Sequence, residues 1–176
     1  MRCTFSTLVF LLAPFAAAAQ DSNPPIEFPK EWAGYLRLQT GFISQTRPSA
    51  ALFTGGVQGM ALYGFWPHRM RGGLVAGGYY ASGNVDGALG PTVSVLIKDL
   101  GPKYFGSVGN IHVSGEYLFT TTKTRLLGGG VHLDLLNRLI LGLTAHRDWD
   151  QRQWWVQTAI AFRVTKPRLA KQTFPQ

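Results

Sequence analysis

From residue 32 onward the chain alternates between apolar and polar side chains with a period of two. In segment 111–120, Val113 and Phe119 fall on one side, whereas His112 and Glu116 fall on the other. Alternation sustained over about ten residues predicts a β-strand with two chemically different faces. We predict eight such strands. They cover residues 32–43, 51–66, 73–81, 92–98, 111–120, 127–135, 139–146 and 154–163.

The segments between these strands are rich in residues that favour turns. Gly, Pro, Asn, Asp and Ser are frequent in them, and none is long enough to form a domain. The predicted turns are 44–50, 66–72, 82–91, 99–110, 120–124, 136–138 and 148–153. The strands are therefore expected to follow one another as antiparallel neighbours in a single all-β domain.

Residues 1–19 have the features of a secretory signal peptide: Arg2, a short apolar stretch, and four alanines before Gln20. Cys3, the only cysteine, lies in this segment, which leaves no disulfide framework in the exported chain. Residues 20–31 are predicted to be an extended, proline-containing periplasmic leader, residues 32–164 a β-barrel, and residues 165–176 a basic C-terminal tail. No later segment has 18 consecutive apolar residues, so any membrane span must use strands.

Composition indicates which face of the strands meets lipid. Only 15% of the residues are charged, against about 25% in soluble domains, and the polar faces consist mostly of Gly, Ser, Thr, Gln and Ala. A soluble barrel would carry more Lys, Glu and Asp on its wet face, whereas a narrow membrane barrel packs small and polar groups inside. Aromatic residues gather near strand ends, as in interfacial girdles. They are Trp32, Tyr35, Phe65, Trp66, Tyr79, Tyr80, Tyr117, Phe119, Trp149, Trp154 and Phe162.

We therefore predict an eight-stranded antiparallel up-and-down transmembrane β-barrel. A soluble exported barrel of the lipocalin or avidin type, with apolar groups inside, is the alternative. Over residues 32–164 the pattern resembles the small outer-membrane barrels of Gram-negative bacteria, the OmpX-like and OmpA-transmembrane-like group. The last strand, from Trp154 to Phe162, is similar to the signal read by their assembly machinery. Such barrels usually end at that aromatic residue, whereas this chain continues to residue 176.

Polar side chains on the lumen face are the first group of candidate site residues. They are Arg37, His112, Glu116, His132, Asp134 and Arg163. Counted from the strand ends, Arg37 and Glu116 fall at similar heights on opposite walls, so we expect an ion pair across the lumen, since buried charges require partners. Its expected role is to fill and stiffen a barrel too narrow for a pore.

Cofactor chemistry and catalysis find little support in the sequence. The histidines at 112, 132 and 146 do not have metal-ligand spacing, and no phosphate-binding loop occurs; we expect no metal and no cofactor. The resemblance raises lipid A hydrolysis as an alternative, because one family of barrel deacylases carries a late His-x-Ser pair. Here the segment is His146-Arg147-Asp148, without the serine, so a non-enzymatic protein is predicted.

The net charge of +8 comes from 17 basic and 9 acidic residues. The basic residues are scattered singly, which argues against nucleic-acid binding. Five of them are predicted in extracellular turns as candidates for lipid phosphate binding: Arg47, Lys123, Arg125, Arg147 and Arg152. The expected partners are outer-membrane lipids including lipopolysaccharide, the outer-membrane assembly machinery, and another envelope complex. The sequence thus predicts an integral outer-membrane barrel with an envelope-structural or partner-binding role.

Overall fold

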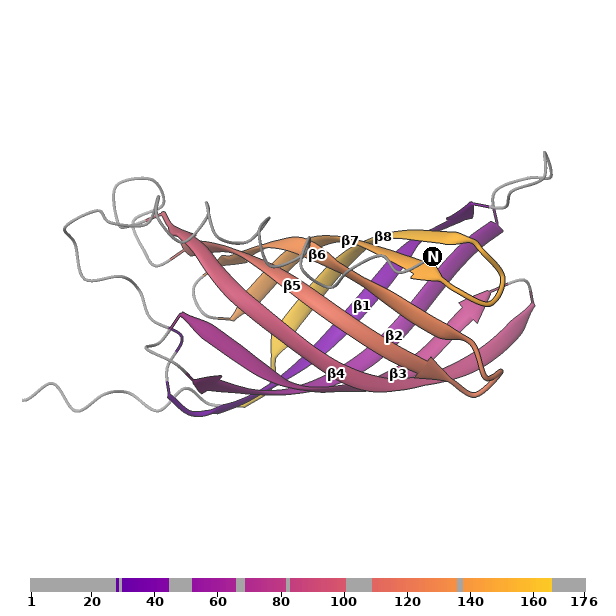
Figure 1. Cartoon of the computed structure of the whole chain (residues 1–176). Coiled ribbons are helices and arrows are strands. Elements are labelled where there is room, and N and C mark those ends of the chain that lie inside the picture. The colour runs from indigo at the N-terminus through magenta and orange to yellow at the C-terminus, as the bar shows by residue number, and fades with distance from the viewer. Residues whose placement is uncertain are drawn as a thin grey trace, which may run out of the picture.

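In the computed structural model of the chain, eight strands close into an antiparallel barrel in which each strand pairs with its neighbours in sequence and β1 pairs with β8 (Figure 1). The strands are β1 (Trp32–Ser44), β2 (Leu52–Phe65), β3 (Met70–Ala81), β4 (Asn84–Asp99), β5 (Gly109–Thr120), β6 (Arg125–Leu135), β7 (Leu139–Asp148) and β8 (Trp154–Arg163). The structure describes residues 28, 30–44, 52–65, 69–81, 83–100, 109–135 and 138–165. The predicted eight-stranded up-and-down barrel is confirmed.

The barrel has two ends, defined by the direction of the strands. At the terminal end β1 begins and β8 finishes; at the distal end β1, β3, β5 and β7 finish. The described residues contain strands, turns and bends, and none of them belongs to a helix long and apolar enough to cross a membrane.

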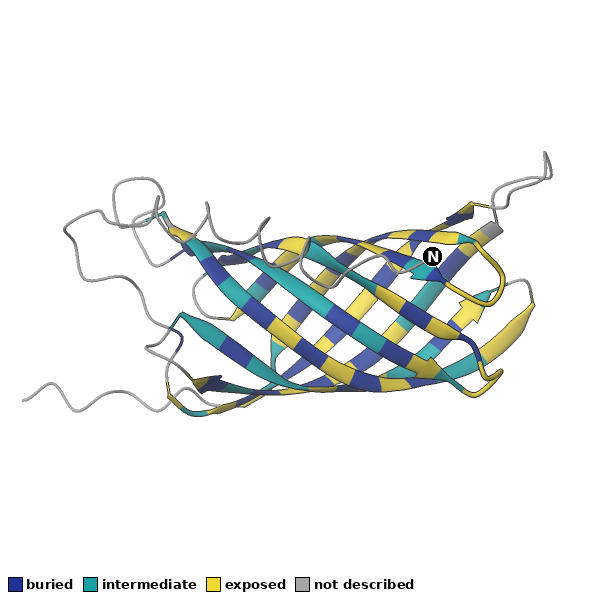
Figure 2. Cartoon of the chain, in the orientation of Figure 1, coloured by how far each residue is buried: buried dark blue, intermediate teal, exposed yellow. Residues whose placement is uncertain are grey.

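Alternation places large apolar side chains outside and gathers the charged and polar side chains inside, together with a set of buried apolar ones. Figure 2 shows buried and exposed positions following one another along most strands. On the outside, Phe42, Leu143 and Val131 expose 59%, 56% and 56% of their surface. On the inside, Arg37, Gln58 and Glu116 are buried. A barrel whose apolar side chains point outward over whole strands has the exterior that lipid, rather than water, requires.

Aromatic side chains mark both ends of this apolar exterior. Trp32, Phe65 and Phe162 are exposed at the terminal end, and Tyr80, Phe119, Trp149 and Trp154 at the distal end. Two residues predicted in these girdles lie elsewhere: Tyr35 and Tyr79 occupy inward positions and are buried in the lumen. Trp66 lies outside the described residues.

Two strands extend further than the alternation predicted. β3 begins at Met70, so Arg71, expected in a turn at the terminal end, occupies a lumen position. β4 begins at Asn84, so most of the predicted turn 82–91 is strand. The pairing of β4 with β5 stops after Leu89–Phe119 and resumes at Thr92–Glu116. The interruption falls at Gly90 and Pro91, where proline has no N–H for the ladder.

Candidate functional site

The lumen is the part of the molecule where charged and polar side chains converge, and it is filled in three layers. The distal layer is mainly apolar and closes the lumen near the hairpin turns. We call it the distal plug; it consists of Ile43, Tyr79, Leu118, Leu126 and Trp155. The rings of Tyr79 and Trp155 meet edge to face with centroids 5.6 Å apart. These buried side chains occupy the lumen at this end.

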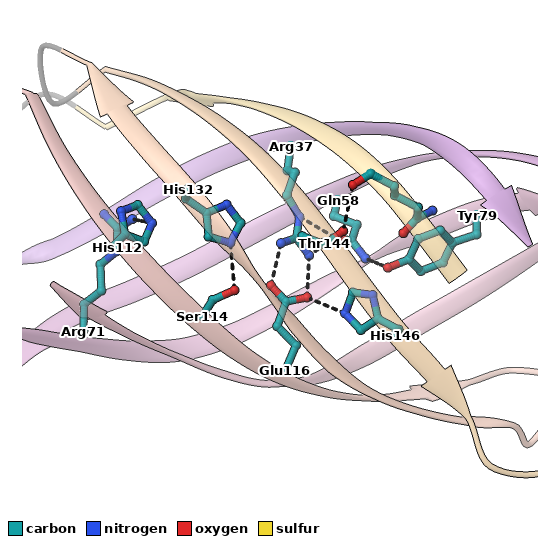
Figure 3. Close-up of polar contacts among 11 residues, drawn as sticks. Arg37, Gln58, Arg71, Tyr79, His112, Ser114, Glu116, His132, Thr144 and His146 are labelled. Carbon is teal, nitrogen blue, oxygen red and sulfur yellow. Dashed lines mark hydrogen bonds and ion pairs between the residues drawn. The ribbon is translucent and has the colours of Figure 1, made fainter. Parts of the chain in front are cut away.

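The central layer is an ion pair across the lumen between β1 and β5 (Figure 3). Arg37 Nη1 donates to Glu116 Oε1 at 2.5 Å, and Arg37 Nη2 donates to Glu116 Oε2 at 2.9 Å. The two bonds form a parallel fork, the strongest geometry for an arginine and a carboxylate. Both side chains are almost wholly buried. The structure thus joins the two residues that sequence analysis placed at similar heights.

Two further strands hold this pair in place. Gln58 of β2 accepts from Arg37 Nε at 2.7 Å and also donates through its Nε2 to the Tyr79 hydroxyl. His146 of β7 donates from Nε2 to Glu116 Oε2 at 3.2 Å. With its amide oxygen turned toward Arg37, Gln39 accepts from Nε at 2.8 Å. The network therefore links β1, β2, β3, β5 and β7 across the barrel.

The terminal layer is built around Arg71. Its Nη1 donates to the Tyr35 hydroxyl at 3.1 Å and lies 3.6 Å from Asp134 Oδ2, and its Nη2 lies 2.8 Å from His112 Nε2. Because a guanidinium only donates, His112 Nε2 accepts, and His112 Nδ1 carries the proton toward Asn110 Oδ1 at 3.2 Å. The layer accounts for two of the predicted lumen residues, His112 and Asp134.

Leader residues close the terminal mouth. The ring of Phe28 is 2% exposed and lies against Arg71, whose Cζ is 4.4 Å from the ring centroid. Phe28 also meets the His112 ring edge to face at 5.7 Å. Glu31, also in the leader, forms an ion pair with Arg163 of β8. Arg163 is thus at the mouth and separate from the central pair, although it was grouped with it from the sequence.

His132 connects the terminal and central layers. Its ring stacks on His112 with centroids 5.0 Å apart, and its Nε2 lies 2.8 Å from Ser114 Oγ. Two glycines make room for the histidine rings across the β6–β7 pair, since Gly142 faces His132 and Gly128 faces His146. A Cβ at Gly142 would lie 2.3 Å from His132 Nδ1. One at Gly128 would lie 2.1 Å from the Ala145 carbonyl oxygen and 2.8 Å from His146 Cδ2.

A small cavity of about 20 Å³ separates the central and terminal layers. Arg37, Met60, Arg71, Ser114, Glu116 and His132 are among the residues that line it. It offers room for about one or two water molecules. Ser114 and His132 resemble a nucleophile and its base, but a cavity of this size admits no acyl or sugar substrate. In the described part of the chain, no three His, Cys, Asp or Glu side chains are arranged to hold a metal ion.

Four of the five candidate lipid-phosphate residues lie outside the lumen, at the distal end. Lys123 and Arg152 are in exposed turns, as expected. Arg125 and Arg147, also predicted in turns, instead belong to β6 and β7 and occupy outward positions. Arg47 lies outside the described residues. The structure therefore gathers four of the five candidates at one rim.

Sequence analysis missed three residues that hold the lumen network. Arg71 was assigned to a turn. The alternation of Arg71, Gly73 and Val75 continues that of β3, and this signal could have placed Arg71 on the inward face. Gln58 lies on the polar face of β2, but its bond to Arg37 depends on the neighbouring strand, which the sequence pattern does not show. Phe28 lies in a leader without periodicity, so no pattern indicated that its ring enters the barrel.

The chain is an eight-stranded transmembrane β-barrel: its outer face is apolar, a charged network lies inside, and β1 pairs with β8 to close it. No protein family and no curated protein matches the sequence. Among solved structures, the chain is similar to a de novo designed transmembrane β-barrel at 18% identity and a TM-score of 0.48, with 75% of this chain and 95% of that chain covered. A second designed barrel, solved by NMR, has 15% identity and a TM-score of 0.42 over 76% and 97% of the two chains.

A third solved structure is the KdgM porin in complex with disordered oligogalacturonate. It has 11% identity and a TM-score of 0.29 over 75% of this chain and 98% of that chain. The assignment of the fold rests on the strand pairing and the two faces of this chain.

Proposed function

We propose that this chain is an integral outer-membrane barrel of a Gram-negative bacterium that is closed to solutes and has an envelope-structural or partner-binding role. The observation that carries the proposal is the filled lumen. The distal plug, the Arg37–Glu116 pair and Phe28 lie one after another along the barrel axis. A porin needs a continuous aqueous path, whereas buried side chains of the described residues occupy this lumen at each of these levels.

The location follows from the exterior and from the predicted signal peptide of residues 1–19. Export would deliver the chain to the periplasm. The outer-membrane assembly machinery would bind the last strand, β8, in which Trp154 and Phe162 point outward at the two ends. The termini then remain in the periplasm. A soluble lipocalin-like protein would need its apolar face inside, the reverse of the arrangement described above.

A non-enzymatic role is proposed because the reactive side chains have no access to lipid. His146 and Asp148 occupy the positions of the histidine and the serine of the barrel-deacylase motif. Both side chains point into the lumen and are buried. His146 is engaged by Glu116. Only Arg147 of this triplet faces outward. A lipid substrate in the membrane would therefore meet the outer side of β7 and neither acid nor base.

Four measurements on the full chain test the proposal. Cell fractionation should recover the protein in the outer membrane, and unboiled samples should migrate faster on gels than boiled ones, as a folded barrel does. In planar bilayers the purified protein should show no conductance. Lipid A from cells making the protein should keep its mass.

A matched pair of variants sharpens the conductance test. Leu126→Gly removes a side chain from the distal plug, whereas Leu127→Gly removes the same atoms from the outer face of the same strand. Any conductance should appear in the first variant alone. Steady channels in the unaltered protein would overturn the closed lumen, recovery in a soluble fraction would overturn the location, and a change in lipid A mass would overturn the non-enzymatic role.

A further inference from the structure

Two arginines on neighbouring strands face outward at the distal rim. Arg125 is the first residue of β6, and Arg147 is the last but one of β7. In the register of this pair Leu127 lies opposite Arg147, so Arg125 is its diagonal neighbour, one step closer to the rim. Diagonal neighbours on one face have Cβ atoms about 7–8 Å apart, which lets two arginine side chains reach a single phosphate group between them.

The surroundings of these arginines are those of a membrane interface. Arg147 lies over the ring of Trp154 on β8, its register partner, with Cζ 5.3 Å from the ring centroid. Trp154 exposes 47% of its surface. Stacking of this kind orients a guanidinium without using its N–H donors, so those of Arg147 remain available to an anion.

Two turns add cations above the arginines. Lys123 and Arg152 are exposed and adopt φ values of 66° and 57°, the left-handed region in which glycine or asparagine is usual. Two carboxylates share this rim. Asp150 accepts the backbone N–H of Arg125 at 3.1 Å, and the buried Asp148 accepts the backbone N–H groups of Asp150 and Gln151 at 2.9 Å. Among the described residues, neither the Arg125 nor the Arg147 guanidinium forms an ion pair. Four cations against two carboxylates, of which only Asp150 is exposed, give the rim a positive charge.

Apolar side chains continue from this group toward the middle of the barrel. Leu127, Leu143 and Val156 lie on the outer faces of β6, β7 and β8 and are exposed. A ligand that fits has anionic groups at the rim and hydrocarbon chains below them. A free anion uses only the upper part of this surface.

We propose that Arg125 and Arg147, aided by Lys123 and Arg152, bind the phosphate of a phosphorylated glycolipid in the outer leaflet, with its acyl chains along β6 to β8. The proposal rests on the outer-membrane location proposed above, and it names the lipid class and the side of the barrel. Guanidinium groups suit phosphate because they donate parallel hydrogen bonds to two oxygens.

The test measures binding of purified rough-type lipopolysaccharide to the detergent-solubilised full chain by native mass spectrometry. The double variant Arg125→Gln with Arg147→Gln should weaken binding about 30-fold. Each cation near a membrane surface contributes about fivefold to binding, and two are removed. Lys98→Gln with Arg138→Gln removes the same charge from exposed positions at the terminal end and should leave binding unchanged. Dephosphorylated glycolipid should bind weakly to all three proteins.

Each outcome bears on one claim. Equal binding by both double variants would overturn the site, and so would equal binding of the dephosphorylated glycolipid to the unaltered protein. Displacement by inorganic phosphate at the same concentration would show a general anion site in place of a glycolipid site. Heat-modified mobility shows whether each variant is folded. Outer-membrane recovery combined with absent glycolipid binding would refute this inference alone, whereas soluble recovery would refute the proposed function.

Discussion

Replacing Glu116 with leucine removes the carboxylate that Arg37 and His146 share. Arg37 would lose charge-assisted bonds of 2.5 and 2.9 Å, and its side chain is only 3% exposed in the unaltered protein. Removing one partner of a buried ion pair costs about 3–5 kcal/mol. Because Gln58 still accepts from the Arg37 guanidinium, we expect the lower end of this range, about 3 kcal/mol of unfolding free energy.

A double-mutant cycle separates the ion pair from general loss of packing. Arg37→Met, Glu116→Leu and their combination are compared by urea unfolding in lipid vesicles, followed by tryptophan fluorescence and heat-modified mobility. The combined variant leaves no unpaired charge, so we expect it to be more stable than the sum of the single losses by about 2 kcal/mol. The closed distal plug should keep conductance absent. Additive losses, or a loss below about 1 kcal/mol for Glu116→Leu, would refute the reasoning.

Three further perturbations probe other parts of the barrel. Gly142→Ala should lower the free energy of unfolding by about 1–3 kcal/mol, because the new Cβ would meet His132 Nδ1 at 2.3 Å; an unchanged urea midpoint would show that the ring moves aside without cost. Leu143→Arg, on the outer face at the middle of β7, should cost about 2–4 kcal/mol in vesicles, and an unaltered stability would contradict its contact with hydrocarbon. Phe28→Ala should speed hydrogen exchange at the His112 ring carbon, measured by mass spectrometry, because Phe28 covers that ring; equal rates would count against the cover.

Strand prediction succeeded where the alternation of side chains was regular and failed where glycine and proline interrupted it. β5 and β6 were expected at 111–120 and 127–135 and differ from the structure by at most two residues at each end. β4 was expected at 92–98 but begins at Asn84. A Cβ at Gly90 would lie 1.8 Å from the Tyr117 carbonyl oxygen on β5. The glycine there reflects contact between strands, which local propensity cannot distinguish from a turn.

The lumen network illustrates a second limit. The sequence indicates which side chains point inward, because each inward position follows from a period of two within one strand. It does not indicate which of them touch. Arg71 meets Tyr35, His112 and Asp134, from three other strands, only because the barrel closes at one particular register.

The sequence by itself therefore determined the all-β class, the number of strands and the side of each strand that meets lipid. These properties depend on residues within about ten positions of one another. The tertiary structure alone decided that His146 binds Glu116, that Phe28 caps the terminal mouth, and that Arg125 and Arg147 form one rim group. Such contacts join residues far apart in the chain or on facing strands, and their distances are fixed by strand register and barrel closure, which no local pattern encodes.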